Sequence, residues 1–128
     1  MNLNPVSKKN ICFAAFFLAL AVAIGAFGAH GLKNLVDPEK LVTFETGVRY
    51  HFYHGFALLM VGILQQLFPG IKLNGVFYSF LVGTLLFSFN CYIYVLTNIK
   101  TFAMIVPVGG LLFIVGWVLL GIKILKLR

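Results

Sequence analysis

Apolar residues dominate the chain in four long runs, which short polar connections separate. The runs cover residues 11–31, 51–68, 75–97 and 102–122. Each is close to the roughly 20 residues that a helix needs to cross a bilayer. The connections carry most of the Lys, Asp, Glu and Pro-Gly residues, as loops do. The pattern predicts an all-α integral membrane four-helix bundle, with residues 1–128 as one membrane domain and successive helices antiparallel.

Composition supports a lipid environment. The 128 residues are 61% hydrophobic and 10% charged, and the mean hydropathy is +1.01. A soluble domain of this length could not bury so much apolar surface. The formal net charge of +7 therefore indicates attraction to anionic lipid headgroups, because no basic run with interleaved aromatic residues points to nucleic acid. We expect the bilayer as the main partner, with a homo-oligomer or a larger membrane complex also possible.

The distribution of basic residues predicts the orientation. Four crossings put both chain ends on one side of the membrane, together with the connection at residues 69–74. That side carries Lys8, Lys9, Lys72, Lys123, Lys126 and Arg128. The other side has fewer basic residues and all three acidic ones, so both termini are expected in the cytoplasm of a multi-pass plasma-membrane protein. The first run also fits a signal peptide that is cleaved after Ala26-Phe27-Gly28, which would remove one crossing.

The stretch TGVRYHFYHGF (46–56) brings titratable groups into an apolar run. On a helix, His51 and His54 lie about 60° apart and share a face. Small residues mark close helix contacts in membranes, so this face is expected to point inward. The small residues on the face are Gly47, Gly55 and Gly62. Glu45 and Arg49 lie on the opposite side as a predicted interfacial ion pair, on a short amphipathic segment over about residues 38–50.

The other runs contribute polar residues to the same half of the bilayer. His30 continues a stripe of small residues that is expected to face inward, namely Ala15, Ala19, Ala23 and Ala26. Asn90 and Tyr94 share a face with Gly83, and the fourth run offers Pro107 and Gly110 for helix packing. The opposite half is expected to be almost purely aliphatic and aromatic. The predicted buried polar cluster consists of His30, His51, His54, Asn90 and Tyr94.

Three ordered blocks carry a resemblance to a known family. They are GAFGAHGL (25–32), FETGVRYHFYHGFALL (44–59) and PVGGLLFIVGW (107–117). The chain resembles the domain of unknown function 423 family, which groups small bacterial membrane proteins with a eukaryotic transmembrane relative. The resemblance implies a four-helix membrane protein of unknown biochemical role, and it puts His30 and His54 on the family's histidine positions.

Three interpretations of the polar cluster follow. In the first, it is a hydrogen-bonded cluster that holds four helices in register, and the protein is a structural or accessory membrane subunit without a cofactor. In the second, His30, His51 and His54 bind a metal ion or haem. In the third, the cluster lines a proton-linked pocket or a pocket for a quinone or lipid. No catalytic motif is present, so an enzyme is not expected.

Overall fold

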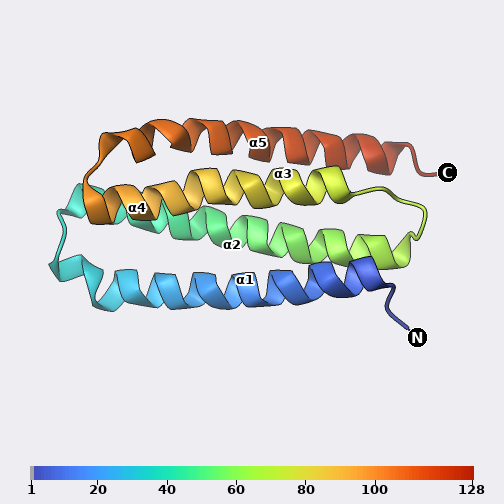
Figure 1. Ribbon diagram of the computed structural model, residues 1–128, viewed down its shortest axis with the longest axis horizontal. Helices are drawn as coiled ribbons and strands as arrows, with labels where there is room; N and C mark the ends of the chain where they lie inside the picture. Colours follow the sequence, from blue (N-terminus) through green and yellow to red (C-terminus); the bar gives the residue numbers. More distant parts are fainter. Residues whose placement is uncertain (1) are drawn as a thin grey trace.

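In a computed structural model, which describes residues 2–128, the chain forms four antiparallel helical rods (Figure 1). The third rod is α-helical at both ends and π-helical in the middle. The rods are α1 (Pro5–His30), α2 (Pro38–Leu67), α3 (Asn74–Thr84) continued by η2 (Leu85–Phe89) and α4 (Asn90–Thr97), and α5 (Lys100–Leu125). A single 3₁₀ turn, η1 (Leu32–Asn34), follows α1. The predicted all-α bundle of four helices is confirmed.

Two helix starts follow from Pro at the first helical position. Pro5 begins α1 after Asn4, whose side chain accepts a hydrogen bond from Ser7 N at 2.8 Å. Pro38 begins α2 after Asp37. Pro suits this position because its φ is already helical and its missing N–H would have no partner there. Consequently α1 starts at residue 5 and not at 11, and the expected amphipathic segment is the first part of one uninterrupted α2.

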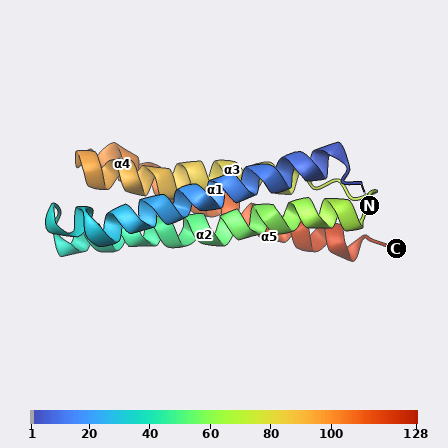
Figure 2. The ribbon, with the colours of Figure 1, turned by 90° about the horizontal axis from the view of Figure 1, so that it is seen from below.

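The rods pack in chain order. α1 packs along α2, α2 packs on α3 and α4, and these pack on α5, whereas α1 and α5 do not contact each other within residues 2–128 (Figures 1 and 2). The two outer helices therefore expose large apolar side chains, such as Phe16 on α1 and Leu111 on α5. An apolar surface of this extent suits contact with lipid.

Three of the rods are long and apolar enough to cross a membrane. They are Pro5–Asn34, Asn74–Thr97 and Lys100–Leu125. α2 is less hydrophobic than these three rods, because it carries His51, His54, Gln65 and Gln66 in addition to the charged residues of its first turns. It is nevertheless the 30-residue rod at the centre of the packing. The crossing predicted for residues 51–68 stays a prediction.

The apolar core has two parts, which share α2. Toward the end that holds both chain termini, Leu58 and Val61 of α2 pack with Phe17 of α1 and Phe80 of α3. Toward the opposite end, Phe44 of α2 packs in a smaller cluster of Leu32, Tyr92 and Val95. The histidines of α2 lie between these two clusters.

Candidate functional site

The two histidines of α2 contact different neighbours. His51 is fully buried, and its Nδ1 lies 3.0 Å from the Tyr92 hydroxyl of α4. Its ring packs against Phe17 of α1, with centroids 4.3 Å apart. His54 instead faces α5, where its ring stacks on Phe113 at 3.5 Å with the planes nearly parallel at 7°. Although His51 and His54 lie only about 60° apart on α2, they therefore reach two different helix interfaces.

Hydrogen bonds define the protonation of His54. Its Nδ1 lies 2.9 Å from the Tyr50 carbonyl oxygen, and its Nε2 lies 3.2 Å from the Trp117 indole nitrogen. An indole N–H can only donate, so Nε2 accepts and carries no proton. The proton therefore sits on Nδ1, which donates to Tyr50. His54 is a neutral link between α2 and α5, with both ring nitrogens bonded inside the protein.

Two buried polar atoms at or near the π-helical turn lack a hydrogen-bond partner, unlike the ring nitrogens of His54. His51 Nε2 and Ser88 Oγ have no hydrogen-bond partner among the residues that the structure describes. Ser88 belongs to η2, and the backbone carbonyl oxygen of Ser88 closely approaches Gly47 of α2. π-Helical turns occur often at functional positions. Here the turn borders the helix interface that holds His51.

Asn90 and Tyr94 do not join the histidines in one cluster. The Asn90 side-chain amide donates to the carbonyl oxygens of Leu85 and Leu86 in the π-helical turn at 3.2 and 2.9 Å. Tyr94 is half-buried and lies under Lys40, whose Nζ is 5.8 Å from the ring centroid. The predicted five-residue cluster is therefore replaced by separate local contacts.

His30 lies apart from the other two histidines, contrary to the prediction. It is exposed at the end of α1, as are Ala15, Ala19, Ala23 and Ala26. The inward face of α1 is formed by other residues, namely Ser7, Asn10, Ala14, Phe17, Ala21 and Gly28. The reason is that α1 lies at the edge of the bundle, along α2 and with Phe13 and Phe17 reaching α3 and η2, so small size does not determine which of its faces is buried.

The three histidines do not converge on a common centre. In the described part of the chain, no group of three His, Cys, Asp or Glu side chains is placed to hold a metal ion. His54 has no free ring nitrogen, because Tyr50 and Trp117 occupy both. The arrangement thus differs from the second interpretation, a metal or haem site of His30, His51 and His54.

Glu45 and Arg49 are both exposed, one turn apart on α2. No hydrogen bond or ion pair joins them within residues 2–128, in contrast to the predicted interfacial pair. The polar contact at this end of the bundle is a different one. Lys40 Nζ donates to Asn98 Oδ1 at 2.6 Å, which ties the first turn of α2 to the end of α4.

The predicted packing glycines on α2 and α3 lie at close contacts. Gly47 faces Cys91 and Tyr92, Gly55 faces Leu18, Gly62 faces Ile11, and Gly83 faces Phe113. On α5 the close contact is at Gly109 and not at Gly110. A Cβ on Gly109 would lie 2.5 Å from the Phe87 nitrogen and 2.7 Å from the Gly83 oxygen, whereas one on Gly110 would meet nothing closer than 3.8 Å. Pro107 is exposed.

A buried amide network lies at the end of the bundle that was expected to be apolar. Asn10 Nδ2 donates to Gln65 Oε1 at 2.7 Å, and Gln65 Nε2 donates to Asn74 Oδ1 at 3.1 Å. Ser7 Oγ donates to the Gly62 carbonyl oxygen at 2.7 Å. These bonds tie α1, α2 and α3 together. The signal for them is the cap sequence Asn4-Pro5, which extends α1 and brings Ser7 and Asn10 onto its inward face.

Two cavities border these polar groups. One, of about 620 Å³, lies beside His54 and Trp117 between α2, η2 and α5, with Phe87 and Pro107 also in its wall. The other, of about 760 Å³, lies beside the amide network. Its wall combines Gln65 and Asn74 with two lysines, Lys72 and Lys123.

The fold and these contacts define a small helical membrane protein whose interior polar groups mostly bond to one another. The chain belongs to the family described as "Protein of unknown function (DUF423)", whose model matches residues 24–110. Curated relatives are named UPF0382 membrane proteins. One from Staphylococcus aureus is 40% identical over 119 residues, which is 93% of this chain and 97% of the relative. YwdK from Bacillus subtilis is 36% identical over 120 residues, or 93% and 98% of the two chains.

No solved structure matches the chain. The relatives agree with the family resemblance that the three sequence blocks indicated, and they match nearly the whole chain. Their names describe a membrane protein and no activity.

Proposed function

We propose that this protein is a multi-pass structural or accessory subunit of the plasma membrane and not an enzyme. The proposal rests on the hydrogen bonding and ring packing of His54. Both of its ring nitrogens are bonded within the bundle, to Tyr50 and Trp117, and its faces are covered by aromatic rings such as Phe113. A side chain held in this way stabilises the helix contact and presents no free nitrogen for proton transfer or metal binding.

Chain direction supports four crossings with both ends in the cytoplasm. α1 and the α3–α4 rod run the same way (Figure 1), so the chain between them has to return across the bilayer. α2 is the segment that does so, covered by α1 on one side and by α3 and α4 on the other. Both chain ends then share the side that is richer in Lys and Arg, which favours the cytoplasm.

Cysteine labelling in intact cells tests this topology. Cys12 and Cys91 are first replaced by Ala, and single cysteines are then introduced at Asn34, before α2, and at Lys126, after α5. A reagent that cannot cross the membrane should label the cysteine at 34 in intact cells, and the one at 126 only after permeabilisation. Labelling of both in intact cells would contradict the crossing by α2.

The structural role is tested by separating stability from cellular function. His51→Gln and His54→Gln should lower the thermal stability of the purified protein, and any cellular defect should scale with the loss of folded protein. A second measurement, native mass spectrometry in mild detergent, distinguishes a homo-oligomer from a complex with other polypeptides. Unchanged stability together with a lost cellular phenotype would argue against a structural role.

The cavity beside His54 supports a second candidate function. Its wall is mostly aromatic and aliphatic, with His54 and Trp117 as polar members, which is the composition of pockets for apolar small molecules. A quinone or a lipid chain would suit it. Addition of a short-chain quinone should then raise the thermal stability, and Gly110→Phe, which fills the cavity, should abolish the effect. The structural proposal expects no quinone effect.

A further inference from the structure

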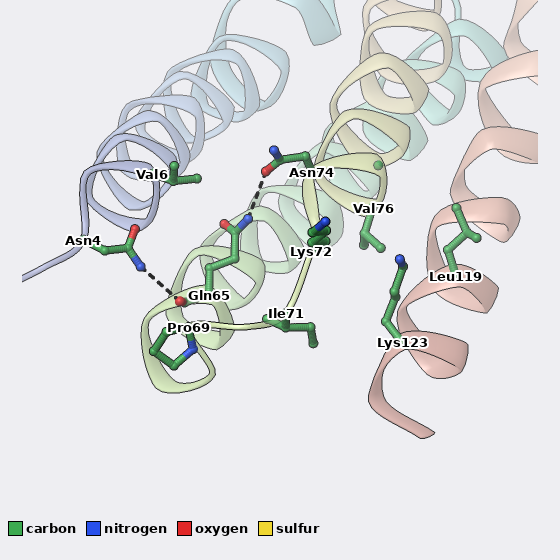
Figure 3. A pocket seen from close by; sticks show the side chains of 11 residues that line it. Asn4, Val6, Gln65, Pro69, Ile71, Lys72, Asn74, Val76, Leu119 and Lys123 are labelled. Carbon is green, nitrogen blue, oxygen red and sulfur yellow. Dashed lines mark hydrogen bonds between the residues drawn. The ribbon is translucent and has the colours of Figure 1, made fainter. Parts of the chain in front are cut away.

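The second cavity lies at the end of the bundle where both chain termini are found. Its volume is about 760 Å³, and all four rods reach it. Figure 3 shows the Lys123 side chain directed from α5 toward the start of α3, where Lys72 and Asn74 lie. Because helix ends surround the cavity, it lies at the level of lipid headgroups if the rods cross the bilayer.

The cavity is electropositive. Lys72 and Lys123 are exposed, and neither ammonium group has a hydrogen-bond partner within residues 2–128. The only acidic side chains of the chain are Asp37, Glu39 and Glu45. All three belong to the start of α2, at the opposite end of the bundle. No carboxylate side chain is therefore available to neutralise the two lysines.

The start of α3 adds to this positive potential. Leu73, which precedes the helix, makes no side-chain cap bond, and the first turn contains no acidic residue. The first N–H groups of a helix lack intrahelical partners and attract anions. Two residues of that first turn, Asn74 and Gly75, line the cavity. The helix end and two independent lysines thus face the same space.

The amide network fixes the start of α3 beside the cavity in place. Asn74 Oδ1 accepts from Gln65 Nε2 at 3.1 Å, which leaves the Asn74 side-chain N–H groups available to donate. Gln65 in turn is held by Asn10 and by Asn4, whose Nδ2 donates to the Gln65 carbonyl oxygen at 3.1 Å (Figure 3). A helix end that is already held in this way binds a ligand with little further loss of conformational freedom.

The rest of the wall is apolar. Val6, Ile71, Val76 and Leu119 also line the cavity. An apolar wall beside a basic rim matches a phospholipid, whose phosphate is anionic and whose glycerol and acyl parts are apolar. Basic pockets between membrane helices on the cytoplasmic side are known to bind anionic headgroups.

We infer that this cavity binds a phosphate group between Lys72 and Lys123, and that anionic phospholipid of the surrounding leaflet supplies it. The ammonium groups donate to the phosphate oxygens, while Val76 and Leu119 contact the apolar part of the lipid. The inference is independent of the structural role proposed above, because it concerns the end of the bundle that holds the chain termini, whereas His51 and His54 lie near the middle of α2.

Native mass spectrometry of the protein released from nanodiscs tests the inference. The nanodiscs contain phosphatidylglycerol and phosphatidylcholine in equal amounts. The wild-type protein should retain phosphatidylglycerol selectively, and K72Q/K123Q should retain it at least about tenfold less, because each substitution removes a charge-assisted hydrogen bond to the phosphate. The matched control is K8Q/K9Q, which removes the same charge at the same end but outside the cavity, and it should retain phosphatidylglycerol as the wild type does.

Two results would overturn the inference. One is an equal loss in K72Q/K123Q and K8Q/K9Q, which would indicate general attraction to an anionic surface. The other is the absence of selectivity in the wild type. Thermal unfolding in phosphatidylcholine alone verifies that both variants are folded. Inorganic phosphate is added as a competitor in a parallel measurement: lipid retention that millimolar phosphate leaves unchanged supports the lipid as the source, and full displacement would assign the site to free phosphate.

Discussion

The Trp117 indole N–H of α5 donates to His54 Nε2 of α2 across 3.2 Å, and this bond connects two rods that are not neighbours in the packing order. His54 receives it while its other nitrogen donates to Tyr50 one turn earlier. The bond therefore favours one rotation of α5 about its own axis and one position of α5 along α2.

Removing the indole donor should weaken this contact. Trp117→Phe keeps an aromatic ring but leaves Nε2 without a donor, so the free energy of unfolding should fall by about 1 kcal/mol, the usual range for such bonds between membrane helices. Thermal unfolding followed by circular dichroism measures the change. A double-mutant cycle with His54→Phe isolates the bond, and strictly additive effects would contradict it.

The Tyr92 hydroxyl should matter to stability, whereas that of Tyr94 should not. Tyr92→Phe removes the partner of His51 Nδ1 in a fully buried site, so we expect a loss of about 1 kcal/mol. Tyr94→Phe is the matched control, because the Tyr94 ring contacts Lys40 through its face and Phe keeps that face. Equal effects of the two substitutions in thermal unfolding would show that the bond to His51 contributes nothing.

Gly109 should tolerate no side chain, in contrast to Gly121 on the same helix. A methyl group at 109 would meet the backbone of Phe87 and Gly83, which cannot move aside as a flexible side chain would. Gly109→Ala should therefore lower the free energy of unfolding by about 1–3 kcal/mol. Gly121 has no atom within 4 Å of an added Cβ, so Gly121→Ala should be neutral or slightly stabilising through helix propensity. Equal melting temperatures of the two variants would disprove the close crossing.

The amide network should depend on Gln65 more than on Gln66. Gln65→Leu leaves the buried Asn10 donor without its partner, which costs about 1–3 kcal/mol. Gln66 is only half-buried, and its side chain bonds near the surface to Asn4 N and the Asn2 carbonyl oxygen. Gln66→Leu should therefore cost less, because water can replace those bonds. A larger loss for Gln66→Leu, measured by chemical unfolding in detergent, would contradict this ranking.

The sequence predicted the presence and order of the rods better than their rotation. The four apolar runs located all four rods, and Pro38 marked the start of α2. Which face of a helix points into the bundle was less predictable, because this depends on the neighbouring helices that it packs against. His30 was expected inward with a stripe of alanines, but α1 lies at the edge of the bundle and exposes that stripe.

Single-residue errors had the same origin. Gly109 and Gly110 are adjacent, and about 100° of rotation separates them, so only the position of α3 relative to α5 determines which one is at the contact.

The network around Gln65 was missed because apolar runs were taken to begin at residue 11, which left Ser7 and Asn10 outside the first helix. The cap at Asn4 was the available signal.

The most direct test of the structural role of His54 is the ¹⁵N NMR spectrum of histidine-labelled protein in lipid bilayers at neutral pH. His54→Gln assigns the resonance, and the chain's only tryptophan supplies an unambiguous indole proton. The account predicts a neutral ring with a proton on Nδ1, a bare Nε2, and magnetisation transfer from the Trp117 indole N–H to Nε2. A doubly protonated ring, a proton on Nε2, or a shift of the Nε2 signal on addition of zinc would contradict it.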